Sequence, residues 1–67
     1  MAKKIAEVRL NSKAGLVQIK MNRGGNHTLK GEKAVRFEQH RNNYIANHIG
    51  ESEANFLAAT DYVEGRL

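Results

Sequence analysis

The chain has 67 residues, a formal net charge of +4, and no proline, cysteine or tryptophan. A chain of this length forms one domain at most, residues 1–67, and it buries only about 60% of the surface that it exposes when unfolded. The lack of cysteine excludes disulfides and thiolate zinc sites as sources of stability. Only 19 residues are apolar and larger than alanine. Because so few apolar residues make a thin core, we expect a homo-oligomer or a chain that docks on a larger partner.

Residues 1–10 contain only isolated apolar residues, whereas a secretory signal needs a continuous apolar run of about seven or more. No stretch approaches the roughly 18 apolar residues of a membrane span. We therefore expect a cytoplasmic protein with no membrane partner.

The two signs of charge are segregated along the chain. Residues 1–36 contain nine basic and two acidic residues, a formal charge of +7, whereas residues 37–67 contain two basic and five acidic residues, a formal charge of −3. An ordinary soluble surface interleaves the two signs. The pattern predicts a basic part, residues 1–33, that meets a polyanion, and a mildly acidic part, residues 34–67, that meets protein. The alternative is that the lysines only solvate the surface.

Two runs in which apolar and polar residues alternate, 6–10 and 17–21, predict an antiparallel β-hairpin. The intervening residues 11–15 are turn formers, and Gly15 can adopt a positive φ. The alternation assigns six side chains to a core face: Ala6, Val8, Leu10, Val17, Ile19 and Met21.

The other face of the predicted hairpin is polar and carries Glu7, Arg9, Gln18 and Lys20. Ile5 and Leu16 fall on this polar face as well, where they are either isolated exposed residues or part of an interface. After the hairpin, residues 23–27 contain two adjacent glycines and predict a flexible loop. Its flanking cations, Arg23 and Lys30, are placed to contact a nucleic-acid backbone.

From Glu32 to Ile49 the apolar residues are spaced for one helical stripe. The stripe consists of Ala34, Phe37, Tyr44, Ile45 and Ile49. The aliphatic part of Arg41 spans a gap in it, and Gly50 is expected to end the helix. The alternative is a second hairpin formed by residues 34–38 and 44–46, which are rich in β-branched and aromatic side chains.

The last segment predicts a second helix, with Ser52 as its N-cap and Glu51 and Glu53 beside the positive end of the helix dipole. Its apolar stripe consists of Phe56, Ala59, Thr60 and Val63, and Gly65 ends the helix. The sequence thus predicts a small α+β domain in which an N-terminal antiparallel β-hairpin precedes two helices. The alternative fold is mostly β with a C-terminal helix.

Two stretches resemble families of dimeric DNA-binding regulators. Residues 33–64, with Val35-Arg36-Phe37 as the ribbon, resemble the ribbon-helix-helix family. Residues 8–13 together with 29–35 resemble the swapped-hairpin antitoxin and transition-state regulators. Each stretch departs from its family, the first by having only 12 residues between Phe37 and Gly50, and the chain is assigned to neither. The resemblances imply a dimeric transcriptional regulator by analogy alone.

The sequence offers little for catalysis. Its three histidines include no pair at i, i+4 that could share a metal, and His40 and His48 stand eight residues apart. There is no cysteine nucleophile and no GxSxG or HExxH motif. Glu51 and Glu53 point apart on a helix because they are two residues apart. We therefore expect no enzymatic activity, no metal site and no cofactor.

Two classes of function remain. The first is a small basic protein that binds nucleic acid, contacting the phosphates of a duplex through its hairpin and Gly-Gly loop. The residues predicted to make these contacts are Arg9, Lys13, Lys20, Arg23, Lys30 and Lys33. All phenylalanines and tyrosines lie in the acidic half, so the hairpin has no aromatic platform for single strands, and a duplex is the preferred partner.

The second class is a small protein, of the kind that viruses and mobile elements encode, that binds and modulates a host protein. Such a protein adds a strand to its partner or docks on it through exposed apolar residues. The residues predicted for this interface are Ile5, Leu16, Phe56 and Val63.

Overall fold

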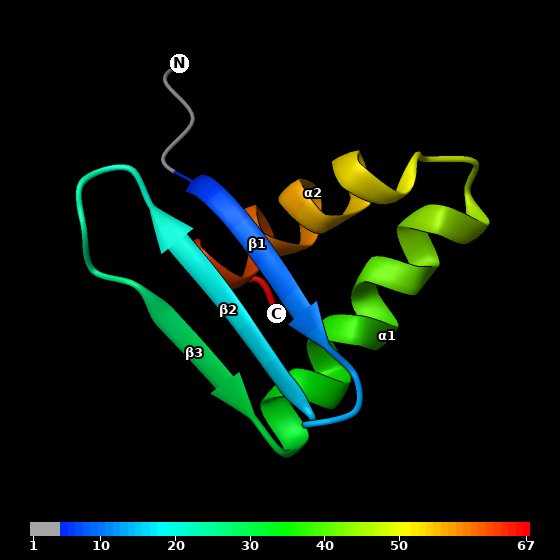
Figure 1. Cartoon of the computed structure of the whole chain (residues 1–67). Coiled ribbons are helices and arrows are strands. Elements are labelled where there is room, and N and C mark those ends of the chain that lie inside the picture. The colour runs from blue at the N-terminus through cyan, green and yellow to red at the C-terminus, as the bar shows by residue number, and fades with distance from the viewer. Residues whose placement is uncertain (1–4) are drawn as a thin grey trace.

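A computed structural model describes residues 5–67 of the chain (Figure 1). Three strands, β1 (Ile5–Asn11), β2 (Leu16–Met21) and β3 (His27–Lys30), precede two helices, α1 (Glu32–Ala46) and α2 (Glu51–Val63). The strands form one antiparallel sheet in the order β1-β2-β3. The α+β fold, with an N-terminal hairpin followed by two helices, is therefore confirmed. Lys3 and Lys4, which contribute to the predicted basic part, lie outside the described residues.

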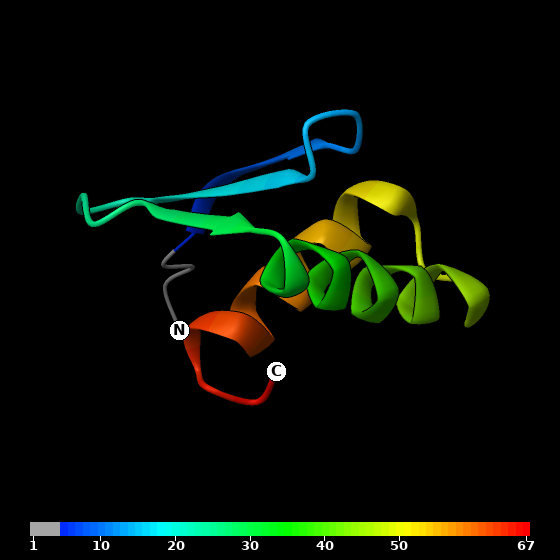
Figure 2. The same cartoon turned by 90° about the horizontal axis from the view of Figure 1, so that it is seen from below.

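Both helices lie on the same side of the sheet, so one face is covered and the other is open (Figure 2). The core fills the space between the two layers. Its buried residues come from the sheet and from both helices: Ile5, Val17, Ile19, Leu29, Ala34, Phe37, Ala58 and Ala59. Phe37 is the largest of the side chains that are fully buried, and it fastens α1 to the sheet.

The third strand was not predicted, because residues 23–27 were interpreted as a loop and residues 28–30 as its flank. β3 has four residues, and only Leu29 among them is buried. One apolar residue in so short a run gives no alternation to detect. Its strand conformation comes from pairing with β2, where Leu29 lies opposite Val17.

The placement of Ile5 on the polar face was wrong. The register shifts between Ile5 and Glu7, because Ile5 pairs with Met21 whereas Glu7 pairs with Lys20. Ala6 is thus the extra residue of a β-bulge, and such an insertion reverses which face the preceding residue occupies. Ile5 is 6% exposed and belongs to the core, while Ala6, predicted for the core, is exposed.

The helical interpretation of the next segment is confirmed over residues 32–46, and the second hairpin is excluded. The helix ends three residues before the predicted Ile49, and His48 then adopts a positive φ of 67°. Ile45 was assigned to the core stripe, but it is 37% exposed. The side chain of Arg41 is only 18% exposed, as expected of a residue that spans the gap in the stripe.

The N-cap of α2 is Gly50, two residues before the predicted Ser52, so Ser52 does not cap the helix. Glu51 and Glu53 do lie in its first turn. At the other end Gly65, at a φ of 79°, donates its N–H to the carbonyl of Tyr62, as a helix-ending glycine does. The buried face of α2 consists of Ala54, Ala58, Ala59 and Asp61. No helix within residues 5–67 is long and apolar enough to span a membrane.

Candidate nucleic-acid interface

The open face of the sheet is polar. Side chains alternate between the two faces of a strand, so the residues next to the buried Val17, Ile19 and Leu29 point away from the helices. These open-face residues are Glu7, Arg9, Leu16, Gln18, Lys20, Thr28 and Lys30. Glu7 and Leu16 are half-buried, and the others are exposed. Leu16 thus lies on the polar face, as predicted.

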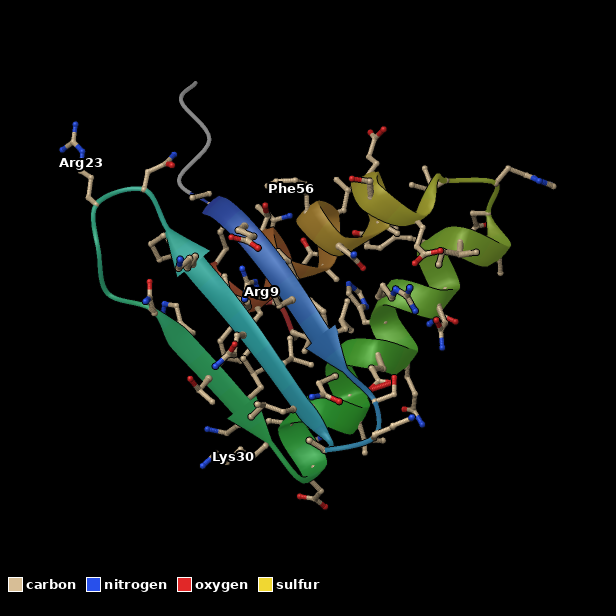
Figure 3. All side chains as sticks on the ribbon, viewed as in Figure 1. Arg9, Arg23, Lys30 and Phe56 are labelled. Atoms are coloured by element: carbon tan, nitrogen blue, oxygen red, sulfur yellow. The ribbon has the colours of Figure 1, made fainter. Side chains whose placement is uncertain are left out.

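The six cations predicted to contact phosphate are all exposed. Arg9, Lys20 and Lys30 come from β1, β2 and β3, so each strand contributes one cation to the open face. Figure 3 shows Arg9 over the middle of the sheet and Lys30 near one end of β3. The structure therefore gathers on one surface three cations that are 10 or 11 residues apart in the sequence.

The turns at the two ends of the sheet add further cations. Lys13 lies in the turn between β1 and β2, and Arg23 lies in the loop between β2 and β3, at the other end of the strands (Figure 3). Lys33 differs, because it belongs to the first turn of α1, which packs on the covered face. We call the five cations other than Lys33 the basic face: Arg9, Lys13, Lys20, Arg23 and Lys30.

Glu7 is the one carboxylate within residues 5–31, and Arg9 pairs with it. The Nε of Arg9 donates to Oε2 of Glu7 at 2.6 Å. This hydrogen bond and the charge of Arg9 lower the pKa of Glu7, and the same hydrogen bond raises the pKa of Arg9. The pair is exposed and adds little to stability. Its main effect is to neutralise the only acid on the basic face.

A shallow hollow of about 130 Å³ lies on the open face, toward the loop between β2 and β3. Its lining consists of Glu7, Arg9, Gln18, Ile19, Lys20, Asn26, His27 and Thr28. Most of these residues are polar or charged, but their aliphatic parts make up more than half of the exposed wall. The hollow by itself therefore does not favour an anionic partner over an apolar one.

A second cluster of polar residues joins the two helices, and sequence reasoning missed it. Asp61 on α2 is only 9% exposed, and its Oδ2 accepts hydrogen bonds from Nε2 of His40 at 2.7 Å and from the hydroxyl of Tyr44 at 2.6 Å. Arg66 lies 3.6 Å from Oδ1. Asp61 follows the buried Ala58 by three residues, so helical spacing places it on the inner face.

The partners of Asp61 determine its ionisation. Burial works to raise the pKa of Asp61, but the hydrogen bonds from Tyr44 and His40, with the charges of His40 and Arg66, hold it below its usual value. The hydrogen bond to Asp61 raises the pKa of Tyr44, which stays a proton donor. Within residues 5–67 His40 is hydrogen-bonded to Asp61 and is not paired with a serine, and the sequence has no cysteine. We interpret the cluster as a polar link between α1 and α2.

The remaining predicted interface residues lie elsewhere. Phe56 and Val63 are half-buried and pack against the core, and Figure 3 shows Phe56 on α2, beside β1. With Ile5 in the core and Leu16 on the open face, these four residues do not form one surface. Within residues 5–67 no three side chains from His, Asp and Glu come together as a metal site would need.

No protein-family model, no curated protein and no solved structure matches the chain. The structure also contradicts the folds that the two sequence resemblances imply. Residues 35–37, the expected ribbon of a ribbon-helix-helix protein, lie inside α1. Residues 29–35, the second half of the swapped-hairpin resemblance, span the end of β3 and the first turn of α1.

Proposed function

We propose that this chain binds a nucleic-acid duplex through the basic face. The observation that carries the proposal is the gathering of three exposed cations on the open face of the sheet, with two more in the turns at its ends, while Glu7 on that face is already paired with Arg9. Lysine and arginine side chains bind a duplex by neutralising phosphates and releasing condensed counterions. The helices cover the opposite face of the sheet (Figure 2), so the duplex approaches from the open side.

The distribution of acidic residues supports the same orientation. Six of the seven acidic residues lie in the helices or directly after α2: Glu32, Glu38, Glu51, Glu53, Asp61 and Glu64. The protein field is therefore negative on the helical side and positive on the open side, which steers a polyanion toward the basic face. The open face carries no phenylalanine or tyrosine for stacking unpaired bases, which favours a duplex over a single strand.

The test is the salt dependence of duplex binding, followed by fluorescence anisotropy with a labelled 20-base-pair duplex. Arg9 is paired with Glu7, so if the other four cations of the basic face each neutralise one phosphate, log K against log salt has a slope of about −3.6, at roughly 0.9 per contact. Lys20→Ala and Arg23→Ala each reduce the magnitude of the slope by about 1. Lys33→Ala and Arg66→Ala are the matched controls, since they remove the same charge away from the basic face. Both controls leave the slope unchanged.

A second candidate is binding to a host protein by strand addition. The order β1-β2-β3 leaves one edge of β1 and one edge of β3 unpaired within the described chain, and unpaired edges accept an added strand. This candidate predicts a flat salt dependence and a duplex Kd no tighter than about 10 μM at physiological salt, within the non-specific range. Leu16 lies on the central strand, away from both edges, so Leu16→Asp would abolish host-protein binding only where the partner docks on the open face rather than adding a strand. A steep salt dependence of duplex binding, with the duplex affinity unchanged in Leu16→Asp, would exclude this second candidate.

A further inference from the structure

Three side chains form a row across the middle of the open face. Arg9 of β1 lies opposite Gln18 of β2, and Gln18 lies opposite Thr28 of β3. All three are exposed, and neither Gln18 nor Thr28 has a side-chain partner among the described residues. Their polar groups are thus directed to solvent from three adjacent strands. We call Arg9, Gln18 and Thr28 the central row.

The chemistry of the central row matches the edges of bases in the major groove. Arginine donates two hydrogen bonds to O6 and N7 of guanine, glutamine bonds N6 and N7 of adenine, and threonine contacts either a polar base edge or the methyl group of thymine. The row spans two strand spacings, about 10 Å. With the row lying along the major groove, this length corresponds to the rise of about three base pairs at 3.4 Å each.

Glu7 prepares Arg9 for this contact. Its carboxylate binds the Nε of Arg9, and the two terminal nitrogens of the guanidinium have no partner within residues 5–67. Those two nitrogens are a pair of donors that can face the two acceptors of guanine. Glu7 is therefore a positioning residue, which limits the directions in which the guanidinium points.

The lysines of the basic face flank the central row on both sides. Lys20 follows Gln18 by two residues on β2, and Lys30 follows Thr28 by two residues on β3. Because these strands are antiparallel, the two lysines lie on opposite sides of the row. This is the arrangement that sequence-specific binding needs, with phosphate contacts that fix the position and base contacts between them that read the sequence.

We propose that the central row reads base edges in the major groove of B-form DNA. The inference rests on the proposed function and adds to it a substrate, double-stranded DNA, and a reading mode. Double-stranded RNA does not offer the same contact, because the major groove of an A-form helix is deep and narrow. Three base pairs rise about 10 Å at 3.4 Å each, so the row contacts about three of them.

The experiment selects duplexes from a randomised DNA library with the wild-type protein and sequences the bound fraction. We expect enrichment of a short motif of about three base pairs that contains guanine. Arg9→Lys keeps the charge but loses the two-point contact, so it lowers the preference for guanine by about tenfold and leaves the salt slope unchanged. Gln18→Ala weakens the base preference at a neighbouring position of the DNA motif. Lys20→Ala is the matched control, and it weakens binding to all sequences while keeping the motif.

Each other result counts against the inference. Steep, salt-dependent binding without an enriched motif would overturn base reading and leave the proposed function in place. A motif that survives both Arg9→Lys and Gln18→Ala would show that other residues read it. Equal affinity for an RNA duplex of the enriched sequence would exclude the major groove. No duplex binding at all would overturn the proposed function and this inference with it. Circular dichroism of each variant checks that the exposed substitution leaves the fold intact.

Discussion

Replacing Phe37 by alanine should unfold the domain. Phe37 is 0% exposed and lies on α1 with its ring in the core, together with Ile19, Leu29 and Val17 of the sheet. Truncating a buried phenylalanine to alanine costs about 3–5 kcal/mol. At roughly 0.05–0.15 kcal/mol per residue, a domain of this size has a total stability of about 3–10 kcal/mol. Loss of this one ring therefore removes most of the free energy of unfolding.

The assay is urea denaturation followed by circular dichroism, with Phe56→Ala as the comparison. Phe56 is half-buried and packs at the margin of the core, so its truncation should cost less than half as much as that of Phe37. We expect Phe56→Ala to stay folded with a lower midpoint, and Phe37→Ala to lack a cooperative transition. A Phe37→Ala variant within about 1 kcal/mol of wild type, or one more stable than Phe56→Ala, would refute the packing of α1 on the sheet.

Two other predictions concern stability and association. The pKa of Asp61 is lower in the folded chain than in the unfolded chain. Its ionised carboxylate therefore adds fully to the free energy of unfolding above the unfolded pKa of about 3.9, and this contribution is lost as the pH falls through the folded pKa. The urea midpoint of wild type should therefore drop in acid, and that of Asp61→Asn should drop less; equal drops would show that the cluster adds no pH-dependent stability. The thin core also predicts a dimer or larger oligomer at micromolar concentration, and sedimentation equilibrium at 7.5 kDa with a cooperative fold would refute this.

The elements that could be predicted are those whose pattern is complete within a short stretch of chain. β1 and β2 each alternate over at least five residues, and α2 has acidic residues in its first turn and a glycine after its last. β3 could not be found in this way, because its four residues contain one buried side chain. Its conformation depends on the exposed edge of β2, which is a tertiary contact. The bulge at Ala6, which moves Ile5 into the core, has no local signal either.

The candidate site likewise has one part that the sequence predicts and another part that depends on tertiary contacts. The cations themselves are visible in the sequence, and their exposure follows from their charge. The central row is not visible, because it depends on the register of three strands and one of these was not predicted. Asp61 was counted only as a surface charge, since its partners His40 and Tyr44 come 21 and 17 residues earlier in the chain. Contacts between distant segments of the chain therefore form the central row and also provide the partners of the buried Asp61.

The segregation of charge along the chain becomes a segregation between two layers. The sheet and its turns supply the basic face, and the helical layer supplies six of the seven acidic residues together with the apolar cover. Because side chains alternate between the two faces of each strand, substitutions on the open face do not change the core residues that pack against the helices. The two layers should therefore respond to different variants: Phe37→Ala changes the folding transition, whereas Lys20→Ala changes the salt slope at unchanged stability. A Lys20→Ala variant that lost both stability and duplex affinity would show that the open face contributes to folding and is not only a binding surface.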